Sequence, residues 1–469
     1  MPTRIRQQLL TAATALLTAA LAACGGGGSG GGVASGGACS VTNQKQFVLD
    51  ATREWYLFQD LLPASVSIAD FATPQELLDF LTATARAQGK DRFFSFLTTP
   101  QADSSFFQEG QFIGFGFRTS IQGNRLLLPD VFEASPAADG GLTRGVEITA
   151  VDSGSGFVPM ATILATDPNL QQAFGPSTEG VQRGLRYLRL NGQPVEVTLI
   201  KRIVTILPVP TTNGVAILTL PSNPSEQVGY IHLRTFISTA ETPLRNAYAQ
   251  FRAQSIQNII VDFRGNGGGL VSVANFIGDL NGRNRAAADV FSKMRFNAAK
   301  SSNDVVRRFL VPARPESVAP VRIAFITTGG TASASELVIN SMKPWVEVAI
   351  VGADTFGKPV GQSAFDMSGC DLRLRLIAFK VTNANDEGDY FDGLASTLAF
   401  ACAATDELAR TPGDALEDST AEALNWLGTG ACGQVMSAAF PGLQMSRAPA
   451  PIPMLERPTP AQAWLPGLF

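Results

Sequence analysis

Apolar side chains recur at helical spacing between residues 44 and 110. In "QKQFVLDATREWYLFQDLL" they fall on overlapping turns, and "TPQELLDFLTATARA" repeats the pattern after a Thr-Pro start, which is a common way for a helix to begin. An aromatic-rich stretch, "DRFFSFLTTPQADSSFF", closes this region. We therefore predict a helical N-terminal region over residues 39–110 that packs on a neighbouring domain through its aromatic end.

The pattern changes to short β-prone runs over residues 111–207. Segments such as "QFIGFGFRT", "VEITAVD" and "PVEVTLIKR" are separated by turns rich in Gly, Pro and Asn. Strands of this length with frequent turn signals are typical of a small β-rich domain. A second domain is therefore expected between the helical region and the rest of the chain.

From about residue 208, apolar strands alternate with amphipathic helices. "QVGYIHLRTF" precedes the helix-like "ETPLRNAYAQFRAQ", and "IQNIIVDFR", "VRIAFITT" and "VEVAIVG" follow with helical segments between them. This alternation indicates a parallel α/β sheet, and "RLRLIAFKVTN" and "TAEALNWLG" add a late strand and a late helix. We assign this α/β core to residues 208–446. Residues 447–469 are rich in Pro and Ala without periodicity, so a disordered tail is expected there.

The N-terminus has the order of an export signal. Arg4 and Arg6 precede an apolar stretch that ends in "LAAC" at Cys24, and this stretch is too short to cross a bilayer comfortably. "LAAC" resembles the bacterial lipobox, in which the cysteine becomes the lipid-bearing first residue. The resemblance implies a lipoprotein signal peptide over residues 1–23. The alternative is an ordinary secretory signal with a chance cysteine.

The segment after Cys24 is rich in glycine and suits a flexible tether over residues 24–38. A lipid on Cys24 implies a location in the cell envelope. Gly25, where some lipoproteins carry Asp, implies the periplasmic face of the outer membrane by analogy with known lipoproteins.

Four further cysteines follow in a chain that is expected to reach an oxidising compartment: Cys39, Cys370, Cys402 and Cys432. Two disulfides are plausible, with three possible pairings, of which Cys370 with Cys402 closes a fairly short loop and is preferred. Metal binding is the weaker alternative, because no C-x-x-C spacing exists and the single histidine is far away in sequence. We expect no metal and no other cofactor.

The formal charge of −4 and the absence of a Lys/Arg block argue against a nucleic-acid partner. Among catalytic schemes, a Ser-His-Asp triad needs a histidine that reaches the nucleophile, but His232 lies in the middle of a predicted strand. A zinc hydrolase needs a cluster of ligands that this sequence lacks. The remaining scheme uses a lysine as general base.

"VRIAFITTGGTASASELVINSM" predicts a buried strand, a glycine turn and a helix that starts near Ser333. At a helix N-terminus, the N–H of Ser333 or of Ala334 can face a developing oxyanion, and the helix dipole favours that charge. Ser333 followed three residues later by Glu336 is also an ordinary capping box. Both interpretations stand on this segment alone.

A second glycine loop, "RGNGGG", ends another predicted strand. Functional loops of a parallel sheet gather at the carboxyl ends of its strands, so this loop can approach Ser333. Gly267, Gly268 and Gly269 leave bare N–H groups that can supply a second oxyanion donor. A phosphate cradle is the rival, but the loop lacks the ending of a P-loop and its spacing does not fit G-x-G-x-x-G. Asp262 and Arg264 are expected to fix the loop.

"DTFGKPVGQ" follows a predicted strand and places Lys358 among apolar and glycine neighbours. To act as a base near neutral pH, its pKa must fall about 3 units, at a cost of about 4 kcal/mol that burial of the ammonium can supply. The alternative is a solvated surface lysine. Lys343, at the predicted helix end, better suits interaction with the helix dipole.

The loop "GFGF", Gly114, Phe115, Gly116 and Phe117, resembles the carboxylate-binding Gly-Leu-Gly-Phe loop of PDZ domains, and "SPAADGGLTRGVEITAVD" resembles the pattern that follows it. The sequence departs from that pattern at Val146, where Asp is usual. Backbone N–H groups in such a loop can hold a carboxylate while an extended peptide adds as a strand. The alternative is that the two glycines permit a bulge.

Taken together, "VDFRGNGGG", "GGTASASE" and "TFGKPVGQ" resemble the C-terminal processing (tail-specific) protease family, serine peptidases with a Ser-Lys dyad and a PDZ domain. In that family the serine lies 25 residues before the lysine, which maps the dyad onto Ser333 and Lys358, and a glutamine four residues after the lysine maps onto Gln362. Ser335 does not fit this spacing. The resemblance implies an α/β multidomain fold with a protease core of ClpP/crotonase-like type.

The implied mechanism has Ser333 as nucleophile, Lys358 as base and Gln362 as its orienting group. Oxyanion donors are expected from Ala334 and from Gly267 or Gly268, and Glu336 matches a supporting position. We expect an exported, lipid-anchored serine endopeptidase that acts on proteins or peptides, selected through their C-terminal tails. A noncatalytic PDZ-containing binding or chaperone-like lipoprotein is the alternative, and an esterase or amidase with the same site is a third possibility.

Overall fold

The computed structural model describes residues 37–436, 462, 465 and 467–469. The predicted signal peptide, the lipidation of Cys24 and nearly all of the tether lie outside the described residues. By their mutual contacts, residues Ala38–Phe469 form one unit, so the domain boundaries expected from the sequence stay predictions. Within the described residues, no helix combines the length and the apolar character needed to cross a membrane.

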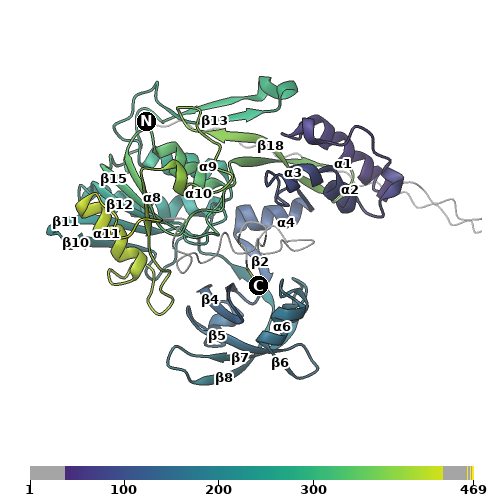
Figure 1. The fold of residues 1–469 in the computed structure, drawn as a ribbon, viewed down its shortest axis with the longest axis horizontal. Coiled ribbons are helices and arrows are strands. Elements are labelled where there is room, and N and C mark those ends of the chain that lie inside the picture. Colours follow the sequence, from purple (N-terminus) through teal and green to yellow (C-terminus); the bar gives the residue numbers. More distant parts are fainter. Residues whose placement is uncertain (1–36, 437–461, 463–464, 466) are drawn as a thin grey trace, which may run out of the picture. The chain divides into compact units, whose positions relative to one another are not determined.

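A six-stranded sheet forms the centre of the C-terminal half of the chain (Figure 1). Its strands are parallel from β11 to β19, and only β10 runs antiparallel to its neighbour. In sheet order the strands are β10 (Val215–Leu220), β11 (Asn223–His232), β12 (Asn258–Asp262), β15 (Arg322–Thr327), β16 (Glu347–Gly352) and β19 (Phe400–Ala403).

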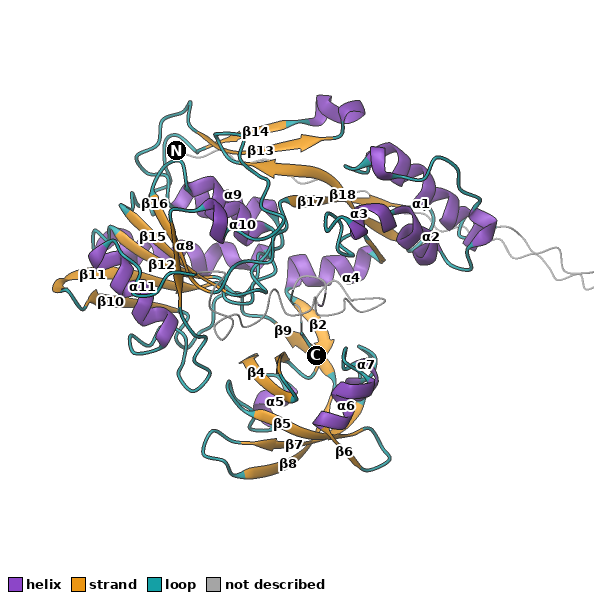
Figure 2. Ribbon diagram, viewed as in Figure 1, coloured by secondary structure: helices purple, strands orange, loops and turns teal. Residues whose placement is uncertain are grey.

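Helices cover both faces of this sheet, because both faces of its strands are apolar. Along β12, Ile259 and Val261 pack toward one hydrophobic cluster and Ile260 packs toward the other. Figure 2 shows these helices around the strands. The first cluster contains residues of α8 (Glu241–Ala253), α9 (Val271–Leu280) and α10 (Ala334–Met342), and the second contains α11 (Asp418–Thr429).

A second, antiparallel sheet was not expected from the sequence. The segment "RLRLIAFKVTN" forms β18 in this sheet and does not extend the parallel one. The strands of this antiparallel sheet are, in order, β1, β18, β13 and β14, and β17 also pairs with β18. The bounds are β1 (Phe96–Thr98), β13 (Val290–Phe296), β14 (Val305–Arg308), β17 (Val360–Asp366) and β18 (Arg373–Thr382).

The N-terminal helices pack on this antiparallel sheet. Val48 and Leu78 share a buried cluster with Leu374 and Leu376 of β18. The apolar face of the N-terminal helices therefore packs against the apolar face of a strand that lies more than 300 residues later in the sequence. The helical region consists of α1 (Val41–Trp55), α2 (Pro74–Leu81), α3 (Ala83–Ala87), α4 (Pro100–Ser104) and the π-helical η3 (Ser105–Glu109).

Between these parts in the sequence, residues 117–200 form a separate sheet in the order β3, β4, β5, β7 and β8, with β6 paired to β5. A two-stranded pair, β2 with β9, leads into and out of it. The bounds are β2 (Gln111–Gly114), β3 (Phe117–Gln122), β4 (Arg125–Val131), β5 (Glu147–Asp152), β6 (Phe157–Pro159), β7 (Gln182–Leu188), β8 (Pro194–Ile200) and β9 (Arg202–Thr205). Short helices complete this part: α5 (Pro136–Asp139), α6 (Met160–Thr166) and α7 (Gln171–Phe174).

Short 3-10 turns connect several elements: η1 (Gln59–Leu61), η2 (Ile68–Asp70), η4 (Ser238–Ala240), η5 (Ala298–Asn303) and η6 (Ala395–Thr397).

The disulfide pairing differs from the preferred one. Cys39 pairs with Cys370, and Cys402 pairs with Cys432. Cys370 lies in the turn between β17 and β18 of the antiparallel sheet, whereas Cys402 lies on β19 of the parallel sheet. Sequence separation does not distinguish the two pairs, because Cys402–Cys432 spans 30 residues and Cys370–Cys402 spans 32. The preferred pair is wrong because its two cysteines belong to different sheets. The Cys39–Cys370 disulfide links the residue just before α1 to the turn between β17 and β18.

The end of the chain also differs from the expected disordered tail. Residues 447–461 lie outside the described part, but Leu465, Leu468 and Phe469 are buried. Composition suggested disorder because Pro and Ala dominate this stretch. The three large apolar side chains at its end find hydrophobic partners on other elements, which a compositional average does not reveal.

Candidate active site

Ser333 precedes α10 in a backbone conformation that an ordinary capping residue does not adopt. Its φ is 57° and its ψ is −112°, whereas an N-cap usually has extended backbone angles. For a residue with a Cβ such a conformation costs on the order of 1–3 kcal/mol and is concentrated at functional sites. Ser333 is partly exposed, while Ala332, Ala334 and Ser335 around it are buried. The strained turn therefore presents the Ser333 side chain and conceals its neighbours.

The glycine loop that follows β12 lies directly against this turn. Gly268 has a φ of 101°, and a Cβ at Gly268 would lie 2.8 Å from the Ala334 nitrogen and 2.9 Å from the Ala332 oxygen. Only glycine accepts both this conformation and this contact. The two loops thus meet at the carboxyl ends of neighbouring parallel strands.

Asn266 holds the two loops together. Its backbone oxygen accepts hydrogen bonds from the Ala332 N–H at 2.9 Å and from the Ser335 hydroxyl at 3.0 Å. Its side-chain oxygen accepts from the Gly268 N–H at 2.9 Å. Sequence reasoning gave Asn266 no role, although an Asn between two glycines is a typical site for a side chain that caps its own turn.

These contacts distinguish the serines of "TASASE". Ser335 is fully buried and its hydroxyl donates to Asn266, so it acts as a structural group. Ser333 is the partly exposed serine of the pair. Of these two serines, only Ser333 is accessible at the surface.

Glu336 connects the serine loop to the lysine loop. Its fully buried carboxylate accepts hydrogen bonds from the N–H groups of Ser333 at 2.9 Å, Gly357 at 2.7 Å and Lys358 at 2.8 Å. Burial raises the pKa of Glu336 to about 6, and these hydrogen bonds act in the opposite direction. The N–H groups of Ser333 and Lys358 donate to the same carboxylate oxygen, so the two backbones lie side by side.

Lys358 is buried, with 6% of its surface exposed. Its Nζ lies 4.5 Å from the centre of the Phe94 ring. Burial lowers the pKa of Lys358 to about 7, while the charges of Asp91 and Glu336 act to raise it. The amine can therefore be neutral near physiological pH, as a general base must be.

The N-terminal helical region supplies one wall around the lysine loop. Arg92 donates to the Phe356 oxygen at 2.8 Å and to the Gly357 oxygen at 2.5 Å, and its guanidinium lies 4.1 Å from the centre of the Phe356 ring. Asp91 is fully buried and accepts from the Phe94 N–H at 2.8 Å. No sequence motif marked these residues, because they come from a separate region some 260 positions earlier.

Gln362 lies on β17, four residues after the lysine. Its amide nitrogen donates to the Phe94 oxygen. Its amide oxygen is buried and has no hydrogen-bond partner among the described residues. An unpaired buried acceptor costs about 1–3 kcal/mol of stability. A nearby donor that forms a hydrogen bond with the Gln362 oxygen would remove this cost.

His232 lies on β11 and is buried, as a strand histidine with a structural role would be. Burial lowers the pKa of His232 to about 4, so its imidazole is neutral near pH 7. The nearby Asp262 pairs with Arg264 at 2.8 Å, and Arg264 also reaches Glu417 at 3.0 Å and Asp406 at 2.5 Å. This buried ionic network fixes the base of the glycine loop, in agreement with the loop-fixing role expected for Asp262 and Arg264.

The predicted peptide-binding loop, Gly114 to Phe117, joins β2 to β3. Gly116 has a φ of 87°, and a Cβ there would lie 2.1 Å from the Ser135 Cβ. The N–H groups of Gly116 and Phe117 donate to the Phe469 oxygen at 2.8 and 3.2 Å. The loop is therefore occupied by a backbone oxygen of this same chain.

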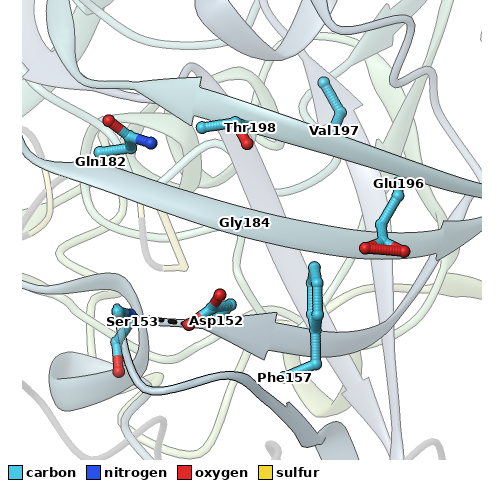
Figure 3. Close-up of a pocket in the computed structure, with 9 residues that line it drawn as sticks. Asp152, Ser153, Phe157, Gln182, Gly184, Glu196, Val197 and Thr198 are labelled. Atoms are coloured by element: carbon cyan, nitrogen blue, oxygen red, sulfur yellow. Dashed lines mark hydrogen bonds between the residues drawn. The ribbon is translucent and has the colours of Figure 1, made fainter.

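A hollow on the separate sheet carries none of the predicted site residues. Figure 3 shows it between β5, β7 and β8, with Asp152, Phe157 and Glu196 around it. The Asp152 carboxylate accepts the N–H groups of Gly154 and Gly156 at 2.7 and 2.9 Å. Asp152 is thus used in the local turn, and the hollow is not part of the site at Ser333.

Comparison with known proteins identifies related chains. The family model for peptidase family S41 matches residues 227–394, and that for the peptidase S41 N-terminal domain matches residues 43–96. The carboxyl-terminal-processing protease of Synechocystis sp. is 27% identical over 281 residues, which cover 59% of this chain and 60% of that protein. The chloroplastic C-terminal processing peptidase of Tetradesmus obliquus is 27% identical over 249 residues, which cover 50% of this chain and 48% of that protein.

The match thus spans about half of the length of these curated relatives. A solved Bacteroides fragilis structure described as an S41 protease superposes with a TM-score of 0.64 at 20% identity, and covers 82% of this chain and 97% of that chain. At this identity the likeness shows a shared fold. It confirms the predicted mixed α/β multidomain class.

Proposed function

Because this chain belongs to peptidase family S41, we propose that it is a serine endopeptidase with Ser333 as nucleophile and Lys358 as general base. The observation that carries this proposal is the Glu336 carboxylate, which accepts from the N–H groups of both Ser333 and Lys358. A shared buried anchor keeps the hydroxyl-bearing and amine-bearing turns adjacent.

In the proposed first step, the Ser333 oxygen bonds to the carbonyl carbon of the peptide and its proton passes to the neutral Lys358 amine. The carbon–nitrogen bond then breaks, and the Lys358 ammonium returns the proton to the leaving amine. Water hydrolyses the acyl-serine ester by the same exchange. The lowered pKa of Lys358, about 7, supports its use as a base without a histidine.

The oxyanion would be held by backbone N–H groups. Ala334 is the first residue of α10, and its N–H has no partner within the helix. Of the two glycines considered, Gly268 already donates to the Asn266 side chain, which favours Gly267 as the second donor. Gln362 is proposed to accept a hydrogen bond from the Lys358 amine through its otherwise unpaired buried oxygen.

We further propose that the chain is exported and attached to the envelope through Cys24, with selection of substrate tails by the Gly114–Phe117 loop. The signal-like N-terminus supports export. The two disulfides, Cys39–Cys370 and Cys402–Cys432, fit an oxidising compartment. Metabolic labelling with a palmitate analogue tests the attachment, which should disappear in Cys24→Ser.

Casein hydrolysis by the chain without its signal segment tests the proposed activity. We expect new peptides, identified by mass spectrometry, from the wild type and none from Ser333→Ala or Lys358→Ala. Ser301→Ala and Lys343→Ala are the matched controls, because Ser301 is exposed and Lys343 pairs with Glu387 at the far end of α10. A wild type that binds but never cleaves casein or peptides would favour the noncatalytic alternative.

A further inference from the structure

The last residues of the chain lie along β3 as an added antiparallel strand. The Phe469 N–H donates to the Phe117 oxygen at 3.0 Å, and the Thr119 N–H donates to the Gly467 oxygen at 2.9 Å. Leu468 is paired opposite Arg118. Because β3 is at the edge of its sheet, these backbone groups are the ones that an incoming peptide strand would use.

Both apolar side chains of this added strand are buried, on opposite sides. Phe469 is 6% exposed, and its ring centre lies 4.7 Å from that of Phe174 of α7. Leu468 is 1% exposed and packs with Phe132 and Ile237. Successive residues of a strand point to opposite faces, so one ligand segment fills two apolar sites at once.

Glycines on both sides of the contact permit this close approach. A Cβ at Gly114 would lie 2.6 Å from the Phe112 ring and 3.0 Å from the Phe469 carbonyl carbon, so glycine is needed there for both contacts. Gly467 has a φ of 79°, and a Cβ there would lie 2.7 Å from the Thr119 oxygen. The backbones of residues 467–469 and of the loop before β3 therefore approach each other as closely as a bound peptide approaches its binding groove.

We propose that residues 467–469 are an internal ligand of the peptide groove, which substrate segments must displace. This inference rests on the proposed function for its consequence in catalysis. The occupant also defines what the groove selects: an extended segment with a large aromatic or aliphatic residue beside Phe174 and a second apolar residue directly before it. Segments with charged residues at these two positions are not accepted.

Tethering makes the internal ligand a strong competitor. Residues 467–469 belong to the same chain as the groove, and an intramolecular ligand of this kind has an effective concentration on the order of millimolar. A free peptide of the same chemistry must exceed this value or bind more tightly. In the resting chain, substrate segments with low affinity for the groove are therefore excluded by residues 467–469. Substitutions at Phe469 should allow such segments to bind.

Binding of a labelled peptide tests this directly and requires no cleavage. The probe is a fluorescein-labelled peptide with the sequence "AQAWLPGLF", measured by anisotropy on chains that carry Ser333→Ala. Adding Phe469→Asp should tighten the apparent Kd by about tenfold or more, because loss of one buried aromatic weakens docking of the internal segment by roughly 10–100-fold. An unchanged Kd in the variant overturns the proposal.

Two controls locate the effect. Leu416→Asp makes the same kind of change at a leucine that is 70% exposed, and it should leave the Kd at the wild-type value. Adding Gly116→Ala to Phe469→Asp should abolish probe binding, because the new Cβ collides with Ser135. Retained binding in that double variant would place the probe elsewhere and overturn the proposal.

Amide hydrogen exchange gives a second measurement that needs no probe. We expect slow exchange at Gly116, Phe117 and Thr119 in the wild type, and faster exchange at these amides in the milder variant Phe469→Ala. Equal protection in both chains overturns the proposal. If the chain passes these tests but does not hydrolyse casein, the internal-ligand proposal stands and the proposed peptidase function fails. Failure of one proposal can therefore be distinguished from failure of the other.

Discussion

The Lys358 backbone N–H donates a hydrogen bond of 2.8 Å to the Glu336 carboxylate, which also accepts from the N–H of Ser333. This buried carboxylate fastens the turn of the proposed nucleophile, Ser333, to the turn of the proposed base, Lys358. Glu336 is therefore more than a cap for its own helix. Its removal should affect the geometry of both proposed catalytic residues at once.

We expect Glu336→Gln to lower kcat by about 10–100-fold and the free energy of unfolding by about 1–3 kcal/mol, since an amide leaves at least one of the three N–H donors unpaired. Urea unfolding and peptide hydrolysis measure the two effects. Glu179→Gln, at an exposed glutamate, should change neither. Wild-type kcat in Glu336→Gln would show that the anchor is dispensable.

Activity should rise with pH as Lys358 loses its proton. Because its pKa is lowered to about 7, kcat/KM is expected to reach half of its plateau near pH 7 and to rise about tenfold per pH unit below it. Glu336, with a pKa raised to about 6, titrates at lower pH. A profile that is flat between pH 6 and 8 would contradict a titrating base at this position.

The same lysine should make stability depend on pH. Between about pH 7 and pH 10.5 the unfolded chain holds a proton on Lys358 that the folded chain has lost, so the free energy of unfolding rises with pH in this window. Lys358→Met removes this dependence. Chemical unfolding at pH 7 and pH 9 should show the wild type gaining stability relative to Lys358→Met, and a constant difference would refute the lowered pKa.

Gly268→Ala should reduce kcat by about 100-fold or more, because its Cβ would lie against the backbone of Ala332 and Ala334. Gly123→Ala is the matched control. Gly123 also has a positive φ, of 61°, but a Cβ there meets nothing within 4 Å. Comparable losses of activity in both variants would show that backbone strain alone, and not crowding of the serine turn, explains the effect.

Arg92→Ala should lower kcat by about tenfold and the unfolding free energy by about 2 kcal/mol, since charged hydrogen bonds to the Phe356 and Gly357 oxygens are lost. The exposed Arg53 provides the control variant Arg53→Ala. If Arg92→Ala loses stability but keeps full kcat, the N-terminal region supports the fold without positioning the lysine loop.

Much of this arrangement follows from local patterns. Apolar strands alternating with helices predicted the parallel sheet, and the rule that loops gather at the carboxyl ends of such strands brought Gly268 near Ser333. The resemblance of two separate motifs to one protease family, in which the serine lies 25 residues before the lysine, then related Ser333 to Lys358. The first two inferences need only a short segment or the geometry of one sheet, whereas the third rests on the family pattern.

The remainder depends on partners that are distant in sequence. Phe94 and Arg92 reach the lysine loop from the N-terminal region, and the antiparallel sheet joins β1 to β18. Asn266 connects two loops through backbone oxygens that any residue type carries. Such contacts are fixed by tertiary packing, so neither periodicity nor a motif in one sequence indicates them.

Covalent labelling of the nucleophile tests the Ser-Lys dyad most directly. The chain is incubated with a fluorophosphonate, and the modified peptide and its rate of formation are determined by mass spectrometry. The dyad predicts a single adduct on Ser333 that forms about 100-fold more slowly in Lys358→Ala than in Lys343→Ala. An adduct on another serine, or an equal rate in the two lysine variants, would contradict it.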